Sequence, residues 1–134
     1  MNHSTSHPFN GLHVLVVEDE SIIREALCMG LEHLGVGRVS SSPNGRKALR
    51  QFSKPEDHPH LILLDIYMPE MDGIEFLTAL LPCGYSGAVA LMSGVNIEML
   101  DLTRSMAADL GYRVVGAVEK PVPLEALEQF LAQV

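Results

Sequence analysis

The stretch LILLD, residues 61–65, decides the fold, because four aliphatic residues run directly into the carboxylate of Asp65. A short continuous aliphatic run, without polar alternation, is typical of a strand that is buried on both faces of a sheet. Three other aliphatic runs also end in polar residues whose carboxylate, hydroxyl or ammonium groups can bind ligands or take part in a reaction. They are residues 12–17 before Glu18 and Asp19, residues 88–92 before Ser93, and residues 114–118 before Glu119 and Lys120.

Helical patterns separate these predicted strands. Apolar residues recur at helical spacing over residues 21–34, and further helices are predicted for residues 44–52, 74–81, 96–110 and 124–134. Residues 38–41 form a weaker strand whose polar side chains place it at an edge of the sheet. Five strand-helix alternations in 134 residues predict an α/β fold with a doubly wound parallel sheet and helices on both faces, because a barrel of such units needs about 250 residues.

Composition limits the classes of function. We expect residues 1–10 to form a flexible polar tail and residues 11–134 to form one domain. The net charge of -8 argues against direct binding to nucleic acid, because an acidic surface repels the phosphate backbone. No apolar run reaches membrane-spanning length and no targeting signal is recognisable, so a soluble cytoplasmic protein is expected. Cys28 and Cys83 lack a metal-type spacing and are expected to be reduced.

The polar residues at the strand ends predict a metal-binding site. The carboxyl ends of parallel strands meet at one edge of a sheet, where open α/β sheets bind ligands. Two carboxylates ~4 Å apart repel by ~4 kcal/mol at an effective dielectric constant near 20. Magnesium accepts one or two carboxylates and keeps several waters, so it is predicted to bind among Glu18, Asp19 and Asp65. Taken alone, the acidic pair also fits a solvated loop before a helix.

Asp65 is the predicted nucleophile of this site. A charge that ends a buried aliphatic strand needs a cation or a reaction to offset its desolvation. Beside magnesium, such a carboxylate can attack phosphorus and form an acyl phosphate. A helix-capping aspartate is the alternative, but a loop and not a helix follows Asp65.

The remaining strand-end residues have supporting roles. Lys120 suits a phosphoryl oxygen or the Asp65 carboxylate, although an exposed lysine beside a turn is the alternative. Ser93 offers a hydroxyl donor, and Gly94 leaves space for a phosphoryl group. Pro121 is a candidate for a cis peptide bond, which would aim Lys120 inward.

Together these motifs resemble the receiver domain of bacterial two-component response regulators. The resemblance covers residues 12–134 and rests on residues 16–20, 63–69, 71–73, 92–94 and 119–121. It implies a flavodoxin-like fold with strand order 2-1-3-4-5 and a sensor histidine kinase that phosphorylates Asp65. It also implies Mg²⁺ bound by Glu18, Asp19, Asp65 and the backbone carbonyl of Tyr67, with Ser93 as the switch hydroxyl, and Lys120 and Gly94 in contact with the phosphoryl group.

One position departs from the family pattern. Receivers usually carry tyrosine or phenylalanine three residues before the lysine, where this chain has Ala117. The resemblance therefore implies a different readout on the face formed by the fourth helix, the fifth strand and the last helix. Residues 111–121 resemble receivers joined to cyclic di-GMP phosphodiesterase domains of the EAL type. The expected alternatives are a receiver with a C-terminal output domain and a single-domain regulator, and either could form a phosphorylation-dependent homodimer.

Two other classes of function fit part of the pattern. Phosphatases of the haloacid-dehalogenase type also use an aspartyl nucleophile and magnesium, but they expect a second aspartate two residues later. Tyr67 stands there, so the acid for the leaving group is missing. A domain that assists its own phosphorylation and dephosphorylation is therefore expected, without enzymatic turnover. The alternative is a pseudo-receiver that binds partners without phosphorylation, which would not require the full set of strand-end residues.

Overall fold

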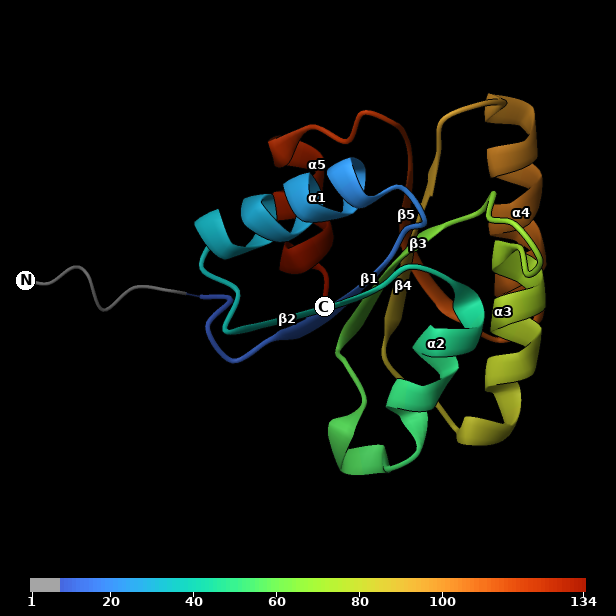
Figure 1. Ribbon diagram of the computed structural model, residues 1–134, viewed down its shortest axis with the longest axis horizontal. Coiled ribbons are helices and arrows are strands. Elements are labelled where there is room, and N and C mark those ends of the chain that lie inside the picture. The colour runs from blue at the N-terminus through green and yellow to red at the C-terminus, as the bar shows by residue number, and fades with distance from the viewer. Residues whose placement is uncertain (1–7) are drawn as a thin grey trace, which may run out of the picture.

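Five parallel strands form one sheet in the computed structural model, which describes residues 8–134 (Figure 1). The strands are β1 (His13–Val17), β2 (Arg38–Ser42), β3 (Leu61–Asp65), β4 (Ala88–Ser93) and β5 (Arg113–Glu119). Their order is β2-β1-β3-β4-β5. The predicted doubly wound α/β fold and the strand order implied by the family resemblance are both confirmed.

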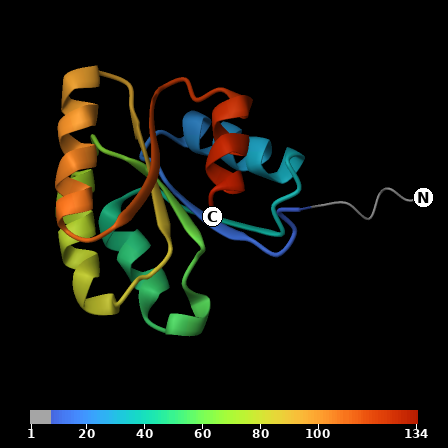
Figure 2. The same cartoon turned by 180° about the vertical axis from the view of Figure 1, so that it is seen from behind.

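Helices cover both faces of the sheet. They are α1 (Ser21–His33), α2 (Gly45–Leu49), α3 (Gly73–Leu80), α4 (Ile97–Asp109) and α5 (Leu124–Ala132). Figures 1 and 2 show α1 and α5 on one face, and α2, α3 and α4 on the other. The predicted helix over residues 44–52 is α-helical only to Leu49, since residues 50–52 tighten into a 3₁₀ turn.

The core consists of two apolar layers, one on each face of the sheet. Leu15, Ile62 and Leu64 face the layer that includes Phe76 of α3. Val16 and Leu63, their neighbours in the chain, face the layer that includes Leu131 of α5. Successive strand residues point to opposite faces, so the central strands β1 and β3 are buried on both sides. These strands form a fixed platform for the residues that follow them.

Local sequence explains several boundaries. The Asp72 side chain accepts a hydrogen bond from the Glu75 N–H, and the Glu75 side chain accepts one from the Asp72 N–H, so a capping box starts α3. Gly35, with φ of 89°, follows the end of α1 in a left-handed conformation that suits glycine. The half-exposed residues of β2 lie at the edge of the sheet, as predicted from their polarity.

The predicted flexible tail over residues 1–10 lies mostly outside the described residues. Residues 8–10 form a turn in which the Phe9 carbonyl accepts hydrogen bonds from the N–H groups of Leu12 and Gly37. Cys28 and Cys83 are free thiols, as predicted. Within residues 8–134, every helix is too short or too polar to cross a membrane.

Candidate functional site

The carboxyl ends of β1, β3, β4 and β5 bring the predicted residues to one edge of the sheet. Val17 pairs with Leu64, so Glu18 and Asp65 lie level at the ends of adjacent strands. Ser93 ends β4 and pairs with Glu119 of β5, directly before Lys120. The parallel register therefore assembles a site from residues that are far apart in the sequence.

Lys120 joins the two buried carboxylates. Its Nζ donates to Glu18 Oε1 at 2.7 Å and to Asp65 Oδ2 at 3.1 Å. The side chains of Glu18 and Asp65 are 0% and 2% exposed, and that of Lys120 is 10% exposed. Buried charges require such pairing, because the loss of hydration costs several kcal/mol for each ion.

Backbone groups bind the other oxygen of each carboxylate. The N–H of Glu20 donates to Glu18 Oε2 at 3.1 Å, and the N–H of Tyr67 donates to Asp65 Oδ1 at 3.2 Å. Arg24 of α1 also donates from Nη1 to the Glu18 carbonyl at 2.8 Å, which fixes the loop after β1. Sequence reasoning did not find Arg24, whose only signal was its position in the helix that follows the acidic pair.

The electrostatic environment raises the pKa of Asp65 to about 6, from 3.8. Burial is the main cause and the negative charge of Glu18 adds to it, while Lys120 and the Tyr67 N–H act in the opposite direction. Burial by itself lowers the pKa of the Lys120 ammonium, but its contacts with Glu18 and Asp65 outweigh this, and the pKa is raised. Asp65 is therefore mostly ionised at neutral pH, but its negative charge is incompletely compensated.

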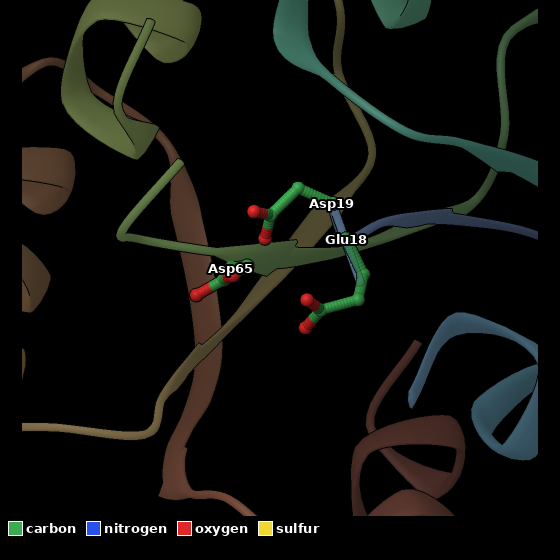
Figure 3. A group of neighbouring side chains, drawn as sticks. All are labelled: Glu18, Asp19 and Asp65. Atoms are coloured by element: carbon green, nitrogen blue, oxygen red, sulfur yellow. The ribbon is translucent and has the colours of Figure 1, made fainter. Parts of the chain in front are cut away.

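Asp19 completes an acidic group that fits a hard cation. One carboxylate oxygen from each of Glu18, Asp19 and Asp65 lies within 4.8 Å of the others. Figure 3 shows the side chains of Glu18 and Asp19 leaving the end of β1 in different directions, with Asp65 beside them. Opposite ligands of octahedral magnesium are about 4.2 Å apart, and magnesium usually retains waters. The donor set therefore fits magnesium with water in part of its coordination shell.

Ser93 also lies at this edge of the sheet, but its hydroxyl is hydrogen-bonded to the backbone and not to a residue of the acidic site. The side chain is buried, and Oγ accepts a hydrogen bond from the Val95 N–H at 3.2 Å. A Cβ at Gly94 would lie 3.5 Å from Cε of Lys120, which places Gly94 beside the lysine stem. The peptide bond between Lys120 and Pro121 is cis.

Ala117 lies on β5, where it pairs with Leu91 of β4. Its side chain is half-buried and packs against the apolar layer beneath α2, α3 and α4. A methyl group thus occupies the position at which the resemblance led us to expect an aromatic ring.

An apolar groove of about 510 Å³ lies beside the charged site, between α1 and α5. We call it the α1–α5 groove, and it is lined by Ile22, Ile23, Ala26, Leu27, Gly30, Lys120, Pro121, Val122, Leu124 and Leu127. The Ile22 side chain is 82% exposed. Sequence periodicity predicted the apolar faces of both helices, but it did not reveal that they leave an open groove between them.

Comparisons with known proteins agree with this arrangement. The family model described as response regulator receiver domain matches residues 14–132. The cyclic di-GMP phosphodiesterase RocR of Pseudomonas aeruginosa is 30% identical over 124 residues, which cover 92% of this chain and 31% of that protein. This chain spans only 26%, 31% and 25% of three curated relatives that it matches.

Solved structures show the same fold. A response regulator from Colwellia psychrerythraea superimposes with a TM-score of 0.73 at 26% identity, over 91% of this chain and 94% of that one. The chemotaxis protein CheY4 of Vibrio cholerae superimposes with a TM-score of 0.75 at 24% identity, over 92% of this chain and 98% of that one.

Proposed function

This chain belongs to the family of response regulator receiver domains of two-component systems, and we propose that Asp65 is its phosphoacceptor. One observation carries the proposal. Asp65 is an almost fully buried carboxylate at the end of a central strand, where it contacts the Lys120 ammonium and adjoins two further acids. A structural aspartate would gain nothing from a second buried carboxylate that raises its pKa.

The proposed reaction transfers a phosphoryl group from a phosphohistidine of a sensor kinase. An Asp65 carboxylate oxygen attacks phosphorus, the phosphorus–nitrogen bond breaks, and the histidine imidazole leaves with the electron pair. Lys120, already within hydrogen-bond distance of Asp65, neutralises charge on the phosphoryl oxygens. Tyr67 occupies the position of a second acid, so the domain would lack the group that drives phosphatase turnover.

Magnesium is the proposed cofactor, held by Glu18, Asp19, Asp65 and the carbonyl of Tyr67. The acidic cluster supports this proposal, since it leaves negative charge that one lysine does not balance. When bound, magnesium would neutralise charge on the transferred group.

The proposed switch begins at Ser93. Phosphorylation adds about one negative charge at Asp65. We expect the Ser93 hydroxyl to leave the Val95 N–H and donate to a phosphoryl oxygen, which would loosen the connection between β4 and α4. Ala117 has no aromatic ring that could change its rotamer when Ser93 moves. The conformational change would therefore be transmitted through α4 itself, to an output domain or to a second copy of this chain. Similarity to RocR supports a cyclic di-GMP phosphodiesterase as the kind of output.

The α1–α5 groove is the proposed docking site for the kinase. It is apolar and reaches Lys120 and Pro121, so a helix bound there would lie next to Asp65. Ile22, exposed at the groove, offers apolar area that a partner helix can bury.

Phosphorylation with acetyl phosphate tests the function directly. We expect intact mass spectrometry to show one phosphoryl adduct on the wild type with magnesium, and none without magnesium or in Asp65→Asn. Asp101→Asn is a matched control, because Asp101 is an exposed aspartate of α4. A folded wild type that gives no adduct, and no spectral change with beryllofluoride, would refute the proposal. That result would favour a phosphorylation-independent interaction module.

A further inference from the structure

A second groove lies between α3 and α4, on the opposite side of the sheet from α1 and α5. It consists of two hollows, of about 220 Å³ and 310 Å³, which share Ile74 and Met106. Figures 1 and 2 both show α3 and α4 side by side along this flank of the molecule. We call it the α3–α4 groove, and its lining residues are Ile66, Tyr67, Asp72, Ile74, Glu75, Thr78, Met99, Thr103, Met106, Asp109 and Leu110.

The middle of the α3–α4 groove is apolar and accessible. Met99 and Met106 of α4 are 39% and 41% exposed, and Ile74 of α3 is partly buried and lines both hollows. Leu102, one turn from Met106, is 53% exposed. Methionine side chains are flexible and polarisable, so they adapt to an apolar group that enters such a groove.

The ends of the groove are acidic. Asp72 and Glu75 line one hollow, and Asp109 lines the other. Among residues 8–134, the salt bridges are those of Lys120 with Glu18 and Asp65, so none of these three carboxylates forms a salt bridge with a lysine or arginine of the described chain. Asp72 and Glu75 each accept one backbone hydrogen bond in the capping box of α3 and keep their negative charges. Helical spacing of about 100° per residue places Arg104 of α4 on the flank away from Met106 and Asp109.

We propose that the α3–α4 groove binds an amphipathic helical segment of a partner protein that carries lysine or arginine beside its apolar residues. The two hollows share Ile74 and Met106, so they are adjacent along the groove and can receive successive apolar side chains of one bound helix. The acidic ends complement flanking basic residues.

A second copy of this chain is a poorer occupant. Its net charge of -8 would place more acidic surface against acidic ends. The proposal goes beyond the phosphoacceptor function. It rests on the unphosphorylated structure, so it can fail while phosphorylation of Asp65 succeeds.

Fluorescence anisotropy with synthetic peptides tests the proposal. The probe is a labelled helical peptide of about 15 residues, with leucines at positions i and i+4 and lysines on either side. We expect saturable binding of this peptide, and weak binding of a scrambled peptide of the same composition. Asp109→Lys should weaken binding about two- to fivefold, the range for exposed charge pairs. Lysine near the end of α4 suits the helix dipole, so this variant should remain folded.

Matched controls separate the groove from the overall charge. Asp101→Lys makes the same charge change on the outward side of α4, and Met29→Gln removes a similar exposed methionine on α1. We expect both controls to bind like the wild type, while Met106→Gln weakens binding several-fold. Equal binding of the scrambled peptide, or equal losses in Asp101→Lys and Asp109→Lys, would overturn the proposal. Wild-type self-association in sedimentation that Met106→Gln abolishes would also overturn it, because a second copy would then be the occupant.

Discussion

Replacing Asp65 with asparagine should stabilise the metal-free protein, even though it removes a salt bridge. The negative charge of Asp65 is buried beside that of Glu18, and burial together with this charge raises its pKa to about 6. Between the unfolded and folded pKa values, the folded protein therefore binds more protons, and its stability falls as the pH rises through this range. Asparagine keeps the shape of the side chain without the charge, and Lys120 keeps its contact with Glu18.

The size of the effect follows from the two pKa values. Moving a carboxyl pKa from 3.8 to about 6 destabilises the fold by ~3 kcal/mol at pH 8, where the group is ionised in both states. Roughly half of this destabilisation remains at pH 5, and the destabilisation disappears at a pH below the pKa that Asp65 has in the unfolded chain. Because the amide of asparagine fits the Lys120 ammonium imperfectly, we expect a net gain of ~1–3 kcal/mol for Asp65→Asn at pH 8.

Urea denaturation in EDTA at pH 5 and pH 8 measures this difference. The gain in free energy of unfolding should be larger at pH 8, and added magnesium should stabilise the wild type more than the variant. Asp101→Asn, on the exposed side of α4, should show neither effect. An Asp65→Asn protein that is no more stable than the wild type at pH 8, or whose gain is independent of pH, would contradict the reasoning.

Three further predictions follow from packing and charge. Ile22→Ser in the α1–α5 groove should slow phosphotransfer from a histidine kinase but leave labelling by acetyl phosphate unchanged. Leu81→Ser, at an exposed leucine of the 3₁₀ turn after α3, is the control. Lys120→Met should lower the free energy of unfolding by about 3 kcal/mol in urea denaturation, because it leaves two buried carboxylates without their cation. Gly116→Ala should cost about 1–3 kcal/mol in the same assay, because a Cβ would overlap a packed phenylalanine ring, whereas Gly11→Ala, with open space around it, should cost little.

Much of the fold could be predicted because two features of the sequence indicate each central strand. Each central strand is a continuous aliphatic run, and each ends where polar residues begin, so the predicted and observed ends of β3 and β4 differ by one residue. The end of α2 could not be predicted in this way. Phe52, in the 3₁₀ turn after α2, contacts Phe76 and Tyr85 edge to face, and those partners come from distant parts of the chain.

The membership of the site could be predicted, but its contacts could not. The rule that parallel strands end at one edge is enough to bring Glu18, Asp65 and Lys120 together. Which oxygen binds the lysine depends on side-chain rotamers set by the surrounding packing, as does the hydrogen bond from Arg24 to the Glu18 carbonyl. The α3–α4 groove escaped prediction for a related reason, since the distance between two helices is set by the core beneath them.

The contacts of Lys120 give Glu18 a role that its acidity alone did not indicate. The ammonium lies 2.7 Å from Glu18 Oε1 and 3.1 Å from Asp65 Oδ2. In the proposed reaction the contact with Asp65 has to be exchanged for one with a phosphoryl oxygen, because the Asp65 carboxylate loses its negative charge once one of its oxygens is bonded to phosphorus. The shorter contact, to a fully buried carboxylate, can persist through that exchange. Glu18 would then hold Lys120 at the edge of the sheet before and after transfer, in addition to supplying negative charge for magnesium.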